Sequence, residues 1–437
     1  MKTGFFFTVA LVLLASVDCR AGAGAAGDAA VQAGQLNAQI GAAVNHSTHC
    51  DTSVSARLPG SSTTAFTKVA TDKFCEDPYN TICGASAAGL AFNRRMQIQP
   101  LKEKAKKAAL YDVAKLLKVK DPEDFTEADI AKYKPALFRA GVEETYREQL
   151  ASHAFADGGG ISQAAINKAE TTIRDSLTQA IATVPGLNVF ERARLLSRVA
   201  KTRIYTDLSA KVMKAIGRDD ISDKLYEACG PDALNDNAFA TKDRDGEPIV
   251  IVCPGTLFAA QGAGSDQKSN LFALLQTLGH ELGHQIDSSQ AIADDVYGPF
   301  EACIERYHTT HLKSPDKYEF GETGFKARVR THAKEIEADF WGTQTAVQYI
   351  KSQKPALDRN QKLRVLRESW EDLCGGKDDS DHPDDHFRIE VLLRRDPAIH
   401  ELMECSEPPE SRLGYTGLNE FSKPGCTLAG PTKKDLF

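Results

Sequence analysis

Residues 277–290 read TLGHELGHQIDSSQ and contain the pattern HExxH as His280-Glu281-Leu282-Gly283-His284. On an α-helix, residues four apart lie on one face, so His280 and His284 can hold one zinc ion. Glu281 would then lie beside the ion, where it can polarise a water molecule on the metal. Five letters with three of them specified also arise by chance, so the motif needs support from the rest of the chain.

The residues around this motif predict a helix that packs into a core. Apolar residues recur there at three- and four-residue intervals, as Phe272, Leu275, Leu278, Leu282 and Ile286. Such a stripe is typical of the buried face of an amphipathic helix, and Ser265 or Asp266 is a suitable cap for its start. The alternative to a metal site is a buried helix whose histidines only form hydrogen bonds.

A catalytic zinc ion needs a third protein ligand and an open position for water. Position 290 is Gln, which excludes the class of enzymes whose third ligand is a histidine six residues after the second. The other common solution is a glutamate from a later helix, and residues 334–342 (KEIEADFWG) offer Glu335 with Asp339 four residues further on. This spacing puts a ligand on the same helical face as a carboxylate that can accept a hydrogen bond from a zinc-bound imidazole. Taken alone, the segment would more often be a solvated acidic face.

The chain has 437 residues, with 53 basic and 60 acidic side chains. This length suits two or three domains or one large lobed enzyme, and the near-balanced charge gives no indication of nucleic-acid binding. Lys2 and the apolar run Phe5 to Ala15 are typical of a secretory signal peptide and too short to span a membrane. We therefore expect a signal peptide at residues 1–20 and a mature chain outside the cytoplasm, secreted or periplasmic, without a transmembrane segment. Cys19 leaves a lipoprotein as the alternative, which Asp18 disfavours.

The rest of the chain divides by composition. We expect an Ala-, Gly- and Ser-rich flexible leader, a short N-terminal segment, a helical accessory region, a catalytic region and a loose tail, at residues 21–70, 71–100, 101–220, 221–427 and 428–437. Helical periodicity is clearest at Leu101–Val119, Ser162–Thr183 and Val189–Ile216, and again from Lys268 to about residue 405. Residues 241–247 (TKDRDGE) predict a hairpin turn before a strand at Ile249–Val252. The prediction is a mainly helical α+β protein with a small sheet.

Ten cysteines are spread along the chain, and none forms a CxxC pair, which argues against a zinc ribbon or a thioredoxin-type site. Cys19 leaves with the signal peptide, and dispersed cysteines in an exported chain usually form disulfides. Up to four bridges can form, with one cysteine left over. Cys229 and Cys253 flank the segment Asn237–Phe239 and are one candidate pair.

Together these features resemble the neprilysin and endothelin-converting-enzyme family of zinc metallopeptidases. Residues 279–287 fit the family's GHExxHxxD, and residues 335–339 fit its ExxAD. The Asn-Ala-Phe at 237–239 matches an edge strand of that family. HPDDHFR at 382–388 matches its HxPxxFR with the proline displaced to 383, and CEDPYNTICG at 75–84 matches its two cysteines eight apart.

The resemblance implies a thermolysin-like gluzincin catalytic domain with a helical accessory region, acting as a zinc metalloendopeptidase on peptide or protein substrates. One zinc ion per chain would be held by His280, His284 and Glu335, with Glu281 as the general base. Asp339 would orient His280. By resemblance, His382 would stabilise the oxyanion. The resemblance also implies that Asn237 and Ala238 pair with the substrate backbone and that Arg388 donates a hydrogen bond to a substrate carbonyl group.

The same resemblance implies the disulfides Cys75–Cys405, Cys83–Cys374 and Cys303–Cys426. The Cys229–Cys253 pair has no counterpart in the family, and Cys50 is then left over.

The resemblance covers residues 73–86 and roughly 230–427, and it fades over 100–220. The family's GGW is GAS here and its NGG is FWG, so we expect a compact, divergent relative whose reduced helical region admits larger substrates. HELGH and EIEAD also look like the membrane-spanning heat-shock and prenyl-protein proteases, which lack this cysteine set and the HxxxxxR segment. The other alternative is a secreted peptide-binding protein that has lost turnover. The sequence sets neither the natural substrate nor the oligomeric state.

Overall fold

The structure of this protein is a computed structural model that describes residues 73–405 apart from 135, 158–162, 185–186, 207–216, 230–236, 254, 258–266, 291–296, 299, 303–314, 377–381 and 395. The expected signal peptide, leader and tail lie outside the described residues, as do the helix cap at 265–266 and the Cys303–Cys426 pair. Within the described part of the chain, helices predominate and a small sheet accompanies them, which confirms the predicted α+β class. No helix there combines the length and apolar character that crossing a membrane requires.

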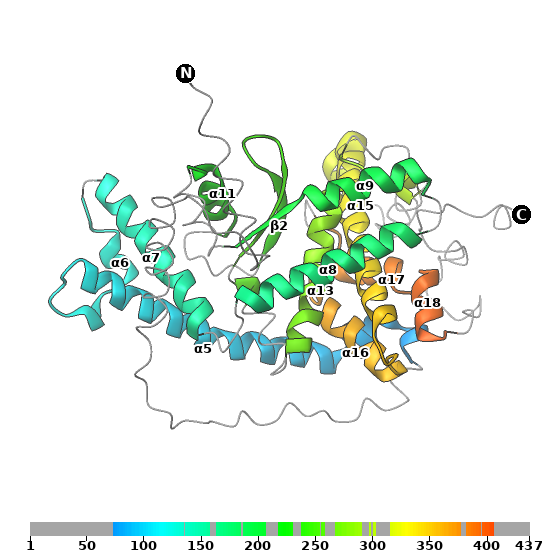
Figure 1. The fold of residues 1–437 in the computed structure, drawn as a ribbon, viewed down its shortest axis with the longest axis horizontal. Helices are drawn as coiled ribbons and strands as arrows, with labels where there is room; N and C mark the ends of the chain where they lie inside the picture. Colours follow the sequence, from blue (N-terminus) through cyan, green and yellow to red (C-terminus); the bar gives the residue numbers. More distant parts are fainter. Residues whose placement is uncertain are drawn as a thin grey trace, which may run out of the picture. The chain divides into compact units, whose positions relative to one another are not determined.

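Two long helices form the centre of the fold. Helix α13 (Gln267–His284) packs along α15 (Pro315–Ser352), and α8 (Gln163–Thr183) lies against both of them (Figure 1). The stripe predicted on α13 is buried, with Leu275, Leu282 and Ile286 at 0% exposure. Three shorter helices complete this layer, namely α16 (Arg359–Trp370), α17 (Asp385–Leu392) and α18 (Pro397–Met403).

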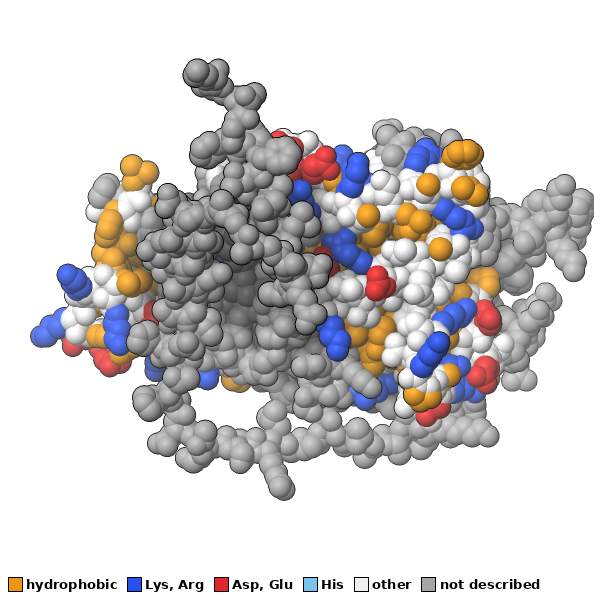
Figure 2. All heavy atoms as spheres, viewed as in Figure 1, with side chains coloured by type: hydrophobic (Ala, Val, Ile, Leu, Met, Phe, Trp, Pro, Cys, Tyr) orange, Lys and Arg blue, Asp and Glu red, His pale blue; other side chains and the backbone are white. Residues whose placement is uncertain are grey.

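A second, separate core lies in a helical lobe. The C-terminal part of α5 (Ala85–Leu116) packs against α7 (Ala136–Asp157), together with the short helices η1 (Pro122–Asp124) and α6 (Glu127–Ile130). Figure 2 shows hydrophobic side chains at the surface of this end of the molecule, where Leu137 and Phe138 are exposed. In contrast, α8 and α9 (Val189–Lys201) join the main core. The expected accessory region 101–220 therefore contributes to both cores.

In the described part of the chain the sheet has three strands, in the order β1-β3-β2. The central strand β3 (Pro248–Val252) is fully buried and corresponds to the predicted strand. β2 (Ala238–Lys242) pairs with it in antiparallel register and is an edge strand, as expected from the Asn-Ala-Phe motif. The predicted hairpin turn joins the two strands, and the Asp243 carboxylate accepts hydrogen bonds from two backbone N–H groups of that turn.

The prediction of a continuous helix over Val189–Ile216 is wrong. Helix α9 ends at Lys201, Thr202 has extended dihedral angles, and β1 (Arg203–Thr206) pairs in parallel with β3. The sequence RIYT is rich in β-branched and aromatic residues, which favour strands. Here pairing with a strand 46 positions away overrides the local helical periodicity.

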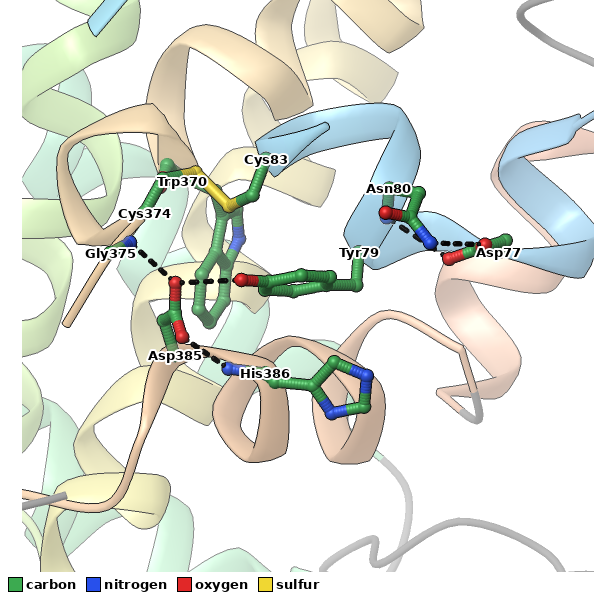
Figure 3. The surroundings of a disulfide bond; sticks show 9 residues. All are labelled: Asp77, Tyr79, Asn80, Cys83, Trp370, Cys374, Gly375, Asp385 and His386. Carbon is green, nitrogen blue, oxygen red and sulfur yellow. Dashed lines mark hydrogen bonds between the residues drawn. A yellow bond between two sulfur atoms is a disulfide. The ribbon is translucent and has the colours of Figure 1, made fainter. Parts of the chain in front are cut away.

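Three of the predicted disulfides are present in the described part of the chain, as Cys75–Cys405, Cys83–Cys374 and Cys229–Cys253. Cys83–Cys374 ties the end of α4 (Pro78–Cys83) to the residue after η2 (Glu371–Leu373), and Cys75–Cys405 joins a residue before α4 to one after α18. The third bridge joins α11 (Asp219–Cys229) to the residue after β3. Figure 3 shows the surroundings of Cys83–Cys374, where the Tyr79 hydroxyl donates to the Asp385 carboxylate at the start of α17 over 3.2 Å. These bridges are compatible with an extracellular location.

Candidate metal centre

His280, His284 and Glu335 bring their ligand atoms together, each within 4.8 Å of the others. The two Nε2 atoms are 3.1 Å apart, and the Glu335 carboxylate oxygens lie 3.3 Å from Nε2 of His280 and 3.4 Å from Nε2 of His284. Four ligands placed tetrahedrally about 2.0–2.1 Å from a zinc ion lie roughly 3.3 Å from one another. The separation of the two nitrogens, and of each nitrogen from its nearer Glu335 oxygen, is therefore of the size that a tetrahedral zinc site requires.

The other ring nitrogens of the two histidines face carboxylates. Nδ1 of His280 is 2.8 Å from Asp339, and Nδ1 of His284 is 3.0 Å from Asp287. A carboxylate only accepts hydrogen bonds, so each Nδ1 carries the donated hydrogen. If both imidazoles are neutral, the lone pair of each Nε2 atom then faces the other Nε2 and the Glu335 carboxylate. These groups repel one another unless a cation lies between them. This is the arrangement that carboxylates impose on zinc-bound histidines.

Asp339 is fully buried and saturated with donors. Besides His280, it accepts hydrogen bonds from Nε and Nη2 of Arg388 at 2.5 and 2.7 Å, and from Nε2 of Gln276 at 3.1 Å. Burial would raise the pKa of Asp339, but the charges and hydrogen bonds of Arg388 and His280 together lower the pKa to about 2. Asp339 is therefore ionised and contacts the ring of His280, the contact that its predicted orienting role requires.

Arg388 was expected to contact substrate. Its guanidinium is nearly buried, at 7% exposure for the residue, and two of its nitrogens bind Asp339. The structure therefore places it in contact with Asp339, the carboxylate beside His280, which the sequence did not indicate. The substrate contact stays a prediction.

The histidines and carboxylates of the candidate site shift one another's pKa values towards the charged forms. Burial would lower the pKa of His280, but the charge of Asp339 raises it to about 9. Burial would raise the pKa of Glu335, but hydrogen bonds from His280 and His284 hold it well below its usual range. Protons and a metal ion thus compete for the same nitrogens.

Glu281 lies between the metal ligands and the sheet. It is 6% exposed, and burial raises its pKa against the opposing charges of the two histidines. Its carboxylate accepts a hydrogen bond from the backbone of Ala240 in β2, and its Oε2 atom has no hydrogen-bond partner. The edge strand and the candidate base are therefore adjacent.

His382 is brought to the same place from the segment before α17. Its Nε2 lies 3.4 Å from Oε2 of Glu335, and its side chain is 48% exposed. Asn237 is exposed at the start of β2, and its carbonyl oxygen accepts hydrogen bonds from Cys253 and Thr256. Ala238 is buried as the first residue of the strand.

Gln285 connects the end of α13 to the sheet. Its side-chain amide donates to the carbonyl oxygens of Thr241 in β2 at 3.1 Å and Ile249 in β3 at 3.0 Å. The distance between the candidate metal ligands and the edge strand is thus fixed by a direct contact. Sequence reasoning missed this residue, because a glutamine next to HExxH carries no signal of its partners.

Small residues let α13 and α15 approach closely. A Cβ added at Gly279 would lie 2.9 Å from Cα of Gly342, and one added at Gly283 would lie 2.9 Å from Cα and O of Ala338. Backbone contact between the helices therefore sets the separation of the two histidines from Glu335.

Comparison with known proteins adds no family assignment, because no protein-family model and no curated protein matches this chain.

Proposed function

We propose that this protein is a secreted, zinc-dependent metalloendopeptidase of the gluzincin type. The observation that carries the proposal is the convergence of His280, His284 and Glu335, with both Nδ1 atoms held by carboxylates. A set of two histidines and one glutamate leaves a fourth tetrahedral position for water, which is typical of catalytic rather than structural zinc sites.

His280, His284 and Glu335 would hold the zinc ion. When bound, zinc lowers the pKa of water towards 7 and polarises a carbonyl group as a Lewis acid. Glu281 is placed to accept the proton of the attacking water and to pass it to the leaving amine. Its raised pKa suits this task, because a carboxylate with a pKa closer to neutrality retains a proton more readily between the two transfers.

The edge strand β2 offers a binding surface for an extended peptide. Its outer side has no strand partner in the described sheet, and a substrate can add to such an edge by backbone hydrogen bonds. Asn237 directly precedes this strand, and Ala240 within the strand contacts Glu281. A bound peptide would therefore run past the base. His382, half-exposed beside Glu335, can donate a hydrogen bond to the developing oxyanion.

The test is peptide-library cleavage by the wild type and Glu281→Gln, with zinc measured in both. We expect one zinc per chain in each and a loss of cleavage in the variant of about 10²–10⁴-fold, the usual contribution of a general base. Glu337→Gln is a matched control. Glu337 lies two residues from Glu335, is fully buried, and burial raises its pKa to about 8, so an amide replaces an already protonated acid.

Three outcomes would contradict the proposal. A wild type without zinc would remove its basis. A zinc-loaded wild type that cleaves nothing would favour a peptide-binding protein on the same fold. Cleavage by Glu281→Gln at the wild-type rate would exclude Glu281 as the base.

A further inference from the structure

Gln276 is a buried polar residue on α13, one turn before His280. It is 2% exposed and faces Asp339 on α15. Its Nε2 atom donates to Oδ1 of Asp339 at 3.1 Å and lies 3.5 Å from the Asp339 carbonyl oxygen. The same Oδ1 accepts from Nδ1 of His280 and from Nη2 of Arg388.

The orientation of this amide is fixed by its neighbours. Oδ1 of Asp339 already accepts hydrogen bonds from His280 and Arg388, so a Gln276 carbonyl oxygen turned towards this acceptor would be repelled, and the amide presents its NH₂ group. The other end of the amide, Oε1, is then buried and has no hydrogen-bond partner among the described residues. An unsatisfied buried acceptor opposes folding, and an apolar side chain of similar size would avoid it. Core packing alone therefore gives no reason for a glutamine at this position.

Gly342 provides the space that the amide occupies. A Cβ at this position in α15 would lie 2.5 Å from Oε1, 2.7 Å from Cδ and 2.9 Å from Nε2 of Gln276. Glycine within a helix is itself unfavourable relative to alanine. Gln276 and Gly342, on different helices, thus each lower the stability of the fold. The hydrogen bond from Gln276 to Asp339 explains why both are present.

We infer that Gln276 is a positioning residue of the zinc site, and that Gly342 is required to accommodate it. Gln276 adds a third donor to the carboxylate oxygen that holds His280, and so limits the rotation of Asp339 and of the imidazole it orients. The inference rests on the proposed zinc site. It extends that site to a residue that touches neither zinc nor substrate.

The experiment measures zinc affinity by competition with a chelator, together with thermal unfolding of the metal-free protein. For Gln276→Met we expect zinc binding about tenfold weaker, at the lower end of the effect of residues that support metal ligands. We also expect an unfolding midpoint equal to or above that of the wild type, because the unsatisfied oxygen is removed. A residue with a purely structural role would show the opposite pattern.

Gln344→Met is the matched control. Gln344 is a buried glutamine on α15 whose amide donates to a carboxylate, that of Asp396, over 2.7 Å. It has no contact with the ligand set, so its replacement should leave zinc affinity unchanged.

Gly342→Ala perturbs the same hydrogen bond from the other helix. It should also weaken zinc binding, and it should have no further effect when Gln276 is already alanine, since the Cβ then has room. Gln276→Met with zinc affinity within twofold of the wild type would overturn the inference, as would a Gly342→Ala effect that persists in the Gln276→Ala background. Absence of zinc from the wild type would instead overturn the proposed function itself.

Discussion

Replacing Gly283 with alanine should weaken both the fold and the zinc site. The new Cβ would lie 2.9 Å from Cα and O of Ala338 and 3.1 Å from Cβ of Trp341. These are backbone atoms and a Cβ, so no change of rotamer relieves the contact. Ordinary contact begins at 3.4 Å, and α13 and α15 must therefore separate by about 0.5 Å near this point.

Two opposing terms set the size of the effect on stability. Overpacking of this kind costs about 1–3 kcal/mol, and a clash with backbone belongs at the upper end. Alanine gains about 1 kcal/mol over glycine in a helix, which leaves a net loss of about 2 kcal/mol. Glu335 lies three residues before Ala338 and moves with α15, while both histidines move with α13. A shift of about 0.5 Å exceeds the tolerance of about 0.2 Å in metal–ligand distances, so zinc affinity should fall by more than tenfold.

Denaturant unfolding of the metal-free protein and chelator competition measure the two effects. Gly141→Ala is the control, because Gly141 also lies within a helix, α7, and a Cβ there meets nothing within 4 Å. That variant should gain about 0.5–1 kcal/mol and bind zinc normally. If Gly283→Ala is stabilised to the same extent with unchanged zinc affinity, the close approach of the two helices at this point is wrong.

Three further predictions concern other parts of the molecule. Arg388→Met removes the arginine partner of the buried Asp339 carboxylate and should destabilise the fold by about 3–5 kcal/mol in denaturant unfolding. A change in KM alone would instead indicate that Arg388 only contacts substrate. Burial raises the pKa of Asp396 from 3.8 to about 6. Its contribution to stability is therefore complete below pH 4 and is lost as the pH rises through 6, by about 3 kcal/mol. Asp396→Asn should remove this loss from the difference between unfolding free energies at pH 4 and pH 7, and an unaltered difference would contradict the assignment. The two N-terminal disulfides span 330 and 291 residues, so when one is intact, the other closes a ring of about 39 residues, the difference between the two. The double variant Cys83→Ser with Cys374→Ser should therefore lower the free energy of unfolding by about 4 kcal/mol under non-reducing conditions.

The candidate metal ligands could be selected from the sequence because metal-binding chemistry imposes local spacing. Two histidines four apart share a helical face wherever that helix lies, and the same holds for Glu335 and Asp339. The apolar stripe of α13 likewise follows from helical periodicity. That the two helices meet was supported only by the resemblance, since periodicity does not specify which helices pack together.

The parts that could not be predicted depend on pairs distant in sequence. The local periodicity of β1 predicts a helix, and only its pairing with β3, 46 positions later, makes it a strand. Arg388 carries a charge that suits a substrate as well as a carboxylate, and only the contact with Asp339 distinguishes the two. Gln276 and Gln285 have no local signal, because each is explained by the carboxylate or carbonyl groups that it meets on another element.

The glycine directly before HExxH and the glycine within it are explained by the same contacts. Gly279 and Gly283 each precede a histidine by one position, so they lie about 100° around the helix from the metal face and share a face of their own. That face meets α15 at Ala338 and Gly342, where small residues allow contact between backbones. Gly283 departs from the family to which the motif is similar. In this chain it is explained by that contact rather than by the metal. The distance from His284 to Glu335 then depends on the contact between two helix backbones, which move less readily than side chains change rotamer. Gly283 has no side-chain atoms that could bind a metal, yet its replacement should disturb the ligand geometry as the replacement of a ligand would.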